Sequence, residues 1–197
     1  MSKIKAILLD ADGLLLKQQR YFSEIYSEQY NVPSELIIPF FRTKFGDCQR
    51  GVADMKEELA PFLKQWGWDK TIEEFLDYWF SSCTEIDSDV LKMIESLRGK
   101  GFKCYLATDQ DKYRGEYIRK NLGLENHLDG FFYSYEIGYS KMEGEFFENI
   151  LKKLNLEPSE VMFCDDDEKN VEVAKKLGSS SFTVSGAGDF RKITDNL

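Results

Sequence analysis

Two acidic residues, Asp10 and Asp12, directly follow an apolar run near the start of the chain. In an extended segment, side chains at positions i and i+2 point to the same side, so these two carboxylates are neighbours. Carboxylates this close repel one another unless a cation or a shared proton compensates their charge. Because acidic residues after a strand also cap helices or fill turns, the pair alone is a weak indication of a reactive site.

A second acidic group follows another apolar run and consists of Asp165, Asp166 and Asp167. Mg²⁺ prefers hard oxygen ligands, uses a couple of carboxylates and leaves room for a substrate phosphate. Asp165 and Asp166, taken together with Asp10, supply such ligands from two separate segments, and they predict a magnesium site. Asp167 is expected instead to lie at the N-terminus of the next helix, where the helix dipole favours a negative charge.

Two further polar groups follow other apolar runs, and these are Thr108 and Lys141. A hydroxyl at the end of a strand can donate to a phosphate oxygen, with help from the N-terminus of the following helix. It can equally be a simple helix cap. Lys141 would offset the charge of a phosphate and of a carboxylate nucleophile, although a Lys in a polar loop is usually solvated. Thr108 and Lys141 become candidates for phosphate binding only because both follow predicted strands, as the acidic residues do.

The elements that must position these groups alternate along the chain. Five apolar runs are expected to form strands, over residues 4–9, 102–107, 131–135, 161–164 and 181–184. Amphipathic segments between them are expected to form helices, over residues 90–97, 112–121, 145–154 and 170–177. This alternation predicts an α/β fold with a doubly wound parallel sheet. Because ligands bind beyond the carboxyl ends of parallel strands, the polar groups above are expected to meet at one edge.

One long segment breaks the alternation. Residues 17–86 contain no convincing strand, but they hold four helical patterns, over residues 18–30, 34–45, 52–65 and 71–83. A helical insert is therefore expected to follow the first strand. The predicted domains are a core formed by residues 1–16 and 87–197, and a helical cap formed by residues 17–86.

Composition restricts the class of partner. The chain of 197 residues has 35 acidic and 26 basic residues, and its net charge is −9. Nucleic acid is disfavoured as a partner, because phosphate backbones recruit stripes of Lys and Arg. A small phosphorylated substrate remains compatible, because a bound Mg²⁺ and a local Lys dominate the field inside a pocket. The four cysteines are widely spaced and include no C-x-x-C pair, which disfavours a zinc site and a disulfide framework. Without a long apolar run, no contact with a membrane is expected, and a cytoplasmic location is predicted.

These residues resemble the haloacid dehalogenase-like hydrolase superfamily, whose members have a Rossmann-like core and, in one class, an α-helical cap of the C1 type. Four motifs occur in the order of the family and cover nearly the whole core: LLDADG, LAT, SKMEGEFFENIL and FCDDDEKNVEVAKKLG. The last motif is the most specific. It places six residues in register with the family pattern: Asp165, Asp166, Asn170, Val171, Ala174 and Gly178.

The resemblance implies a role for each candidate residue. Asp10 would be the nucleophile that forms an aspartyl-phosphate, and Asp12 would be the general acid and base. The implied magnesium ligands are Asp10, Asp12 through its backbone carbonyl, Asp165 and Asp166. Thr108 and Lys141 would hold the phosphoryl group. An acid at position 12 favours phosphoryl chemistry over carbon–halogen cleavage, because a departing halide needs no proton.

The chain departs from the family pattern at three positions. Asp109 stands where Asn is common, Met142 replaces the usual Pro, and Cys164 occupies a place often held by Gly or an aliphatic residue. A carboxylate beside a phosphate is repulsive unless it is turned away. Asp109 is nevertheless included with Thr108 and Lys141 among the candidate phosphate-binding residues.

Three functions remain open at this point. The first is a phosphatase for a small phosphorylated metabolite such as a sugar phosphate, a nucleotide or a phosphoacid. The second is a phosphomutase with the same chemistry, which would return the phosphoryl group to a sugar. The third is a non-enzymatic phospho-accepting module of the receiver type. Receivers are shorter, and they carry their paired acids after the first strand and the acceptor after the third. Here Asp10 and Asp12 come first, Asp165 and Asp166 follow the fourth strand, and a large insert intervenes, which disfavours the third function.

Overall fold

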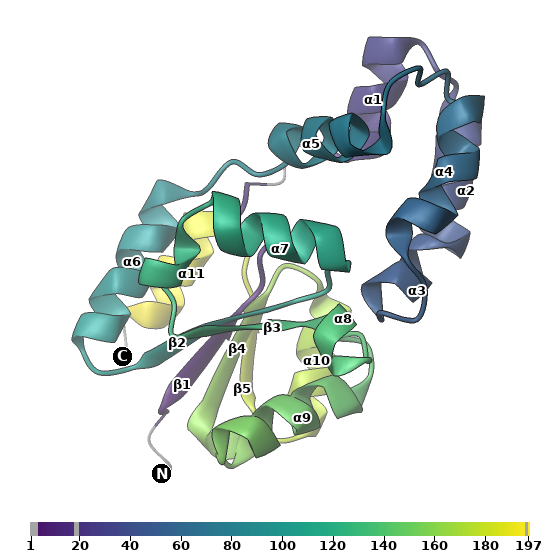
Figure 1. The fold of residues 1–197 in the computed structure, drawn as a ribbon. Coiled ribbons are helices and arrows are strands. Elements are labelled where there is room, and N and C mark those ends of the chain that lie inside the picture. Colours follow the sequence, from purple (N-terminus) through teal and green to yellow (C-terminus); the bar gives the residue numbers. More distant parts are fainter. Residues whose placement is uncertain (1–3, 18–19, 196) are drawn as a thin grey trace.

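A single parallel sheet organises the chain in the computed structural model, which describes residues 4–17, 20–195 and 197 (Figure 1). The strand order is β3-β2-β1-β4-β5, and every neighbouring pair is parallel. The strands are β1 (Ala6–Leu9), β2 (Lys103–Thr108), β3 (Gly130–Tyr133), β4 (Val161–Asp165) and β5 (Ser180–Thr183). The predicted fold class, a doubly wound α/β sheet with a helical insert after its first strand, is confirmed.

The central strand β1 is buried on both faces. Ile7 and Leu9 pack into one hydrophobic cluster, whereas Ala6 and Leu8 pack into another on the opposite face. This alternation follows from the period of two in a strand, and it explains why the run is apolar throughout. In the sheet register, Leu9 lies beside Leu106 of β2 and beside Cys164 of β4. Beyond this level β2 continues for two residues to Thr108 and β4 for one residue to Asp165, so the three strands end close to one another at the same edge of the sheet.

Helices cover both faces of the sheet. One face packs against α6 (Ser88–Gly99), α7 (Lys112–Asn121) and α11 (Gly186–Thr194). The other face packs against α9 (Gly144–Leu154) and α10 (Glu168–Lys176). Asp87 and Asp111 begin α6 and α7 by accepting hydrogen bonds from two backbone N–H groups each. Such caps satisfy donors that a helix leaves free at its N-terminus.

The insert between β1 and α6 is helical and builds a core of its own. Its helices are α1 (Phe22–Tyr30), α2 (Ser34–Thr43), α3 (Phe45–Gln49), α4 (Met55–Gln65) and α5 (Ile72–Ser82). Aromatic side chains dominate its hydrophobic cluster, and Tyr26, Phe40, Trp66 and Phe75 are almost fully buried. Figure 1 shows these helices standing beyond one end of the sheet. The proposed division into a core and a cap at residues 17–86 remains a prediction.

Two segments that run side by side join the insert to the core. The Lys17 backbone N–H donates to the carbonyl of Glu85 (2.8 Å), and the Asp87 N–H donates to the carbonyl of Leu15 (2.9 Å). An exposed ion pair between the side chains of Lys17 and Glu85 (2.6 Å) adds a contact that contributes little in water. The insert is thus attached through a short two-stranded connection.

Several element boundaries differ from the prediction. The strand expected over residues 131–135 ends at Tyr133, and Ser134 begins a short helix, α8 (Ser134–Ile137). The Ser134 hydroxyl accepts the backbone N–H of Gln110 (3.0 Å), which ties this turn to the loop after β2. The helix expected over residues 34–45 is divided at Lys44 between α2 and α3. The helix expected over residues 18–30 begins only at Phe22, because the preceding residue Tyr21 is extended, and residues 18 and 19 lie outside the described part.

The last helix, α11, was not predicted. Its sequence begins with Gly186 and contains Gly188, and glycine lowers the intrinsic preference for a helix. The fully buried side chain of Phe190 packs it into the main hydrophobic cluster beside α6. Tertiary packing therefore stabilises a helix that the local sequence does not indicate.

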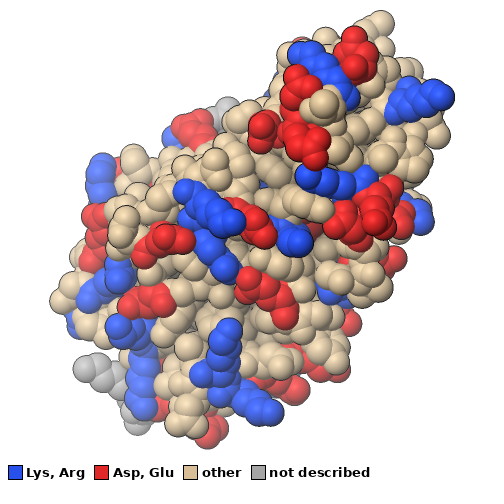
Figure 2. Space-filling view, in the orientation of Figure 1, with Lys and Arg blue, Asp and Glu red and all other residues tan. Residues whose placement is uncertain are grey.

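Charged side chains are spread over the surface, whereas the cysteines lie mostly in the interior. Figure 2 shows basic and acidic side chains interspersed over the visible face of the molecule, on the core and on the insert. The four cysteines are free thiols, and Cys104 and Cys164 are fully buried. Within the described residues, no helix is long and apolar enough to cross a membrane. The predicted cytoplasmic location is not tested.

Candidate active site

Three of the predicted carboxylates meet at the carboxyl edge of the sheet. Asp10 follows β1, Asp165 ends β4, and Asp166 comes next, and each offers an oxygen within 4.8 Å of the others. Asp165 is fully buried, and its carboxylate accepts hydrogen bonds from Asn170 Nδ2 (3.2 and 3.3 Å) and from the Asp167 backbone N–H (2.8 Å). Asn170, a residue of α10, thus helps to fix the orientation of the Asp165 carboxylate.

Lys141 lies inside this acidic cluster and is not solvated. Its Nζ is 2.7 Å from Asp10 Oδ1 and 2.7 Å from Asp165 Oδ2, and the residue is only 4% exposed. Burial alone would lower the pKa of Lys141, but the neighbouring carboxylates of Asp10 and Asp165 hold it above its ordinary value. Lys141 therefore stays charged and bridges two buried carboxylates from separate strands.

The charges in this cluster are not balanced by Lys141 alone. Burial raises the pKa of Asp10 above its ordinary value despite the opposing effect of Lys141, and Asp165 and Asp12 raise it further. Asp10 Oδ1 is buried and receives no hydrogen bond of good geometry from the described residues. Three carboxylates with hard oxygen donors and a deficit of positive charge suit a divalent cation such as Mg²⁺. The residues present therefore fit the predicted metal.

Gly13 is needed for the position of Asp166. Its φ of 78° lies in the left-handed region, and a Cβ built there would collide with Asp166 Oδ2. We expect Gly13→Ala to displace the Asp166 carboxylate and to weaken Mg²⁺ binding by about 10–100-fold, the effect typical of disturbed supporting groups. Isothermal titration with Mg²⁺ measures this, with Gly186→Ala as a control, because Gly186 also has a positive φ but an added Cβ there meets nothing within 4 Å. Equal affinities in the two variants would contradict the prediction.

Thr108 and Asp109 lie at the end of β2, next to the cluster. Thr108 is buried, and its hydroxyl oxygen accepts a hydrogen bond from Gln110 Nε2 (3.2 Å). The Asp109 carboxylate accepts the backbone N–H of Lys141 (3.0 and 3.3 Å). It is therefore turned toward the loop that carries Lys141. Burial raises the pKa of Asp109, while Lys141 opposes that rise.

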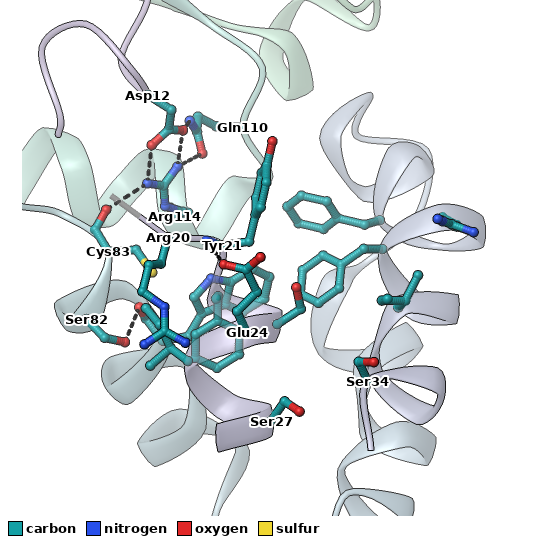
Figure 3. Close-up of a pocket in the computed structure, with 18 of the residues that line it drawn as sticks. Asp12, Arg20, Tyr21, Glu24, Ser27, Ser34, Ser82, Cys83, Gln110 and Arg114 are labelled. Carbon is teal, nitrogen blue, oxygen red and sulfur yellow. Dashed lines mark hydrogen bonds and ion pairs between the residues drawn. The ribbon is translucent and has the colours of Figure 1, made fainter. Parts of the chain in front are cut away.

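Asp12 is held by two residues that sequence reasoning missed (Figure 3). Arg114 donates from Nη1 to Asp12 Oδ2 and from Nη2 to Asp12 Oδ1, both at 2.6 Å, and Gln110 Nε2 donates to Oδ2 at 2.8 Å. Burial would raise the pKa of Asp12, but Arg114 lowers it below its ordinary value. Arg114 sits in the first turn of the helix after Thr108, and that position was the only available signal for it.

A cleft opens from these residues toward the insert. Its volume is about 1260 Å³, and Asp12, Asp109, Gln110 and Arg114 line its core side. Helices α1, α2, α3 and α5 supply its other wall, which includes three aromatic side chains in mutual contact, Phe41, Phe45 and Trp79. Gln49 of α3 crosses the gap and donates to the backbone carbonyl of Asp109 (3.1 Å). The insert thus contacts the core at Asp109, one of the predicted phosphate-binding residues.

The structure brings all the predicted site residues to one place. Asp10, Asp165, Asp166 and Lys141 form the charged cluster. Asp109 contacts the backbone of Lys141, and Gln110 links Thr108 to Asp12. Asp167 is apart from the cluster: its side chain accepts the Lys169 N–H and caps α10, as expected. The chemical role of each residue remains a prediction.

Comparison with known proteins adds independent information. The family model described as haloacid dehalogenase-like hydrolase matches residues 4–178, which run from just before β1 to the end of α10. A D-ribitol-5-phosphate phosphatase from Bacteroides thetaiotaomicron is 28% identical over 132 residues, which are 64% of this chain and 64% of that protein. A phosphorylated carbohydrates phosphatase from Thermotoga maritima is 25% identical over 179 residues, which are 89% of this chain and 82% of that protein.

A solved structure agrees on the fold. A haloacid dehalogenase-family enzyme from Bacteroides thetaiotaomicron, crystallised in complex with magnesium and inorganic phosphate, superposes with a TM-score of 0.81 at 22% identity. The superposition covers 96% of this chain and 98% of that one. At this identity, the likeness supports the arrangement of the sheet and of the insert.

Proposed function

This chain belongs to the haloacid dehalogenase-like hydrolases, and we propose that it is a Mg²⁺-dependent phosphatase for a small phosphorylated metabolite. The predictions of the family and of a hydrolytic enzyme are confirmed by the family match. One observation carries the proposed activity. The buried Lys141 bridges Asp10 and Asp165 beside Asp166, so that a nucleophile, a cation and metal ligands share one sheet edge.

The relatives suggest which metabolite. One is named for D-ribitol 5-phosphate and another for phosphorylated carbohydrates. A phosphorylated sugar or polyol is therefore the substrate class that we propose first for this chain. The cleft above the site includes polar side chains that suit hydroxyl groups, among them Glu24, Ser27, Ser34 and Arg42.

The residues suit a two-step transfer. A carboxylate oxygen of Asp10 would attack phosphorus while the bond from phosphorus to the leaving oxygen breaks, and Asp12 would give that oxygen a proton. The negative charge of the bound phosphate would favour that proton on Asp12 against the lowering effect of Arg114 on its pKa. In the second step, Asp12 would take a proton from water as the water attacks phosphorus and the bond to Asp10 breaks. Thr108 and Lys141 would hold the phosphoryl oxygens. Mg²⁺ held by Asp10, Asp165, Asp166 and the Asp12 carbonyl would neutralise phosphate charge.

Removal of the metal tests this proposal. We expect phosphate release from an aryl phosphate to fall to background in excess chelator and to return when Mg²⁺ is added. The released inorganic phosphate is measured directly, and it is measured also with a sugar phosphate as substrate, because a phosphomutase would return the phosphoryl group to the sugar as an isomer instead of releasing phosphate. A panel of sugar and polyol phosphates then ranks substrates. Turnover that is undiminished in chelator would contradict the proposal. Stable phosphorylation of the protein without release of inorganic phosphate would favour a non-enzymatic module.

A further inference from the structure

One guanidinium holds the Asp12 carboxylate from across the fold, and the two-step transfer does not by itself require it. Arg114 is 102 residues away in the sequence and is only 6% exposed. Its two terminal nitrogens each contact a different oxygen of Asp12, both at 2.6 Å. Such a paired contact between planar groups sets the plane of the carboxylate as well as its distance. Figure 3 shows the two groups facing each other at the core side of the cleft.

The contacts divide unequally between the two oxygens of Asp12. Oδ2 accepts from Arg114 Nη1 and from Gln110 Nε2 (2.8 Å), whereas Oδ1 accepts only from Arg114 Nη2 among the described residues. A carboxylate oxygen has about two acceptor positions. The contacts therefore fill Oδ2 and leave one position on Oδ1. Proton transfer by Asp12 in this arrangement would use Oδ1.

Arg114 is itself held at several points. Asp111 caps α7 and accepts the backbone N–H of Arg114 (3.3 Å), and Gln110 Oε1 accepts from Nη1 (2.7 Å). Nη2 also donates to the backbone carbonyl of Cys83 (3.3 Å), and Cys83 ends α5, the last helix of the insert. The Arg114 side chain thus contacts three places. These are Asp12, which is the proposed general acid and base, Gln110 in the loop after β2, and Cys83 at the C-terminal end of the insert.

We propose that Arg114 is the positioning residue for Asp12, which it orients so that Oδ1 serves the leaving oxygen and then the attacking water. The inference rests on the proposed function. The contact to Cys83 ties this orientation to the place where the insert returns to the core. Without the guanidinium, the Asp12 side chain would rotate among several positions, and only Gln110 would remain to hold it.

This role has a consequence that a purely structural ion pair would not have. A 4-nitrophenolate group leaves without a proton, whereas an unsubstituted phenolate is a stronger base and departs more readily when it is protonated. Misplacement of Asp12 would therefore slow the first step for phenyl phosphate and spare it for 4-nitrophenyl phosphate. The second step, in which water must lose a proton, would slow for both substrates.

The test compares Arg114→Met and Arg114→Lys with the unmodified enzyme. For Arg114→Met we expect turnover of phenyl phosphate to fall by about 100-fold or more, in the range of general acid–base catalysis. With 4-nitrophenyl phosphate we expect a rapid burst of about one equivalent of nitrophenolate, then slow turnover, with phosphorylated protein recoverable by acid quenching. Arg114→Lys keeps the charge without the paired contact, and its turnover should lie between those of Arg114→Met and the unmodified enzyme. Lys120→Met, an exposed position on the same helix, is the control.

The outcomes separate this role from the proposed function. Equal losses with both substrates and no burst would overturn the positioning role and leave the phosphatase proposal intact, as would unchanged rates. Absence of turnover in the unmodified enzyme would overturn both. Circular dichroism and thermal unfolding verify the fold of each variant. If Arg114→Met does not fold, Arg114→Lys decides the question. The two readouts are then the nitrophenolate burst and the ratio of the rates with phenyl phosphate and 4-nitrophenyl phosphate.

Discussion

Asp10→Asn is expected to reduce phosphate release from an aryl phosphate by on the order of 10⁴-fold or more, because it removes the attacking carboxylate. The amide occupies almost the same volume, so the packing at the end of β1 should survive. An amide oxygen is a much weaker nucleophile than a carboxylate oxygen. The substitution also removes one negative charge from the predicted metal site. Initial rates at saturating Mg²⁺ measure the effect, together with a trap for phosphorylated protein, which should no longer form.

A matched control comes from the same kind of residue. Asp167 is also an acidic residue after a strand, but its side chain caps α10 and lies outside the cluster. Asp167→Asn keeps a residue that caps helices well, and we expect it to retain activity within a few-fold. If Asp10→Asn and Asp167→Asn had the same activity, Asp10 would not be the nucleophile.

Lys141→Met is expected to destabilise the protein by about 3 kcal/mol at neutral pH in the presence of chelator. Removing one partner of a buried ion pair leaves the other charge uncompensated, and such changes cost about 3–5 kcal/mol. Here two buried carboxylates, Asp10 and Asp165, lose the same partner. Activity should fall with stability, because the phosphoryl oxygens also lose a positive charge. Denaturant unfolding followed by circular dichroism measures the free energy of unfolding.

Two comparisons sharpen this result. Lys175→Met breaks an exposed pair with Glu172 (3.0 Å), and such pairs contribute about 0–1 kcal/mol, so it should be almost neutral. Repeating the unfolding of Lys141→Met with Mg²⁺ should recover part of the lost stability, because a metal bound only by the folded state stabilises it. A loss no larger than that of Lys175→Met would show that Lys141 does not compensate the cluster.

Local sequence was sufficient for much of the fold and for the charged cluster. Parallel strands buried on both faces leave continuous apolar runs, and residues after such runs lie at one sheet edge because the strands share a direction. Asp10, Thr108, Lys141 and Asp165 were found by this reasoning. The helical insert was visible because its helices carry their own apolar stripes. By contrast, the end of β3 and the helix α11 depended on contacts with distant segments, through Ser134 and Phe190.

The sequence alone was therefore sufficient to identify Asp10 and the residues around it as site residues. Only the tertiary structure showed which other side chains and backbone groups contact them. Apart from its place in the first turn of the helix after Thr108, nothing local to Arg114 indicates that it reaches Asp12, because the two residues are 102 positions apart and meet only on folding. Nothing local to Asp109 shows that it turns toward the Lys141 N–H. The physical reason is the same in both cases. A strand pattern specifies where a side chain begins, but the direction and the protonation of that side chain are set by charges brought close only on folding.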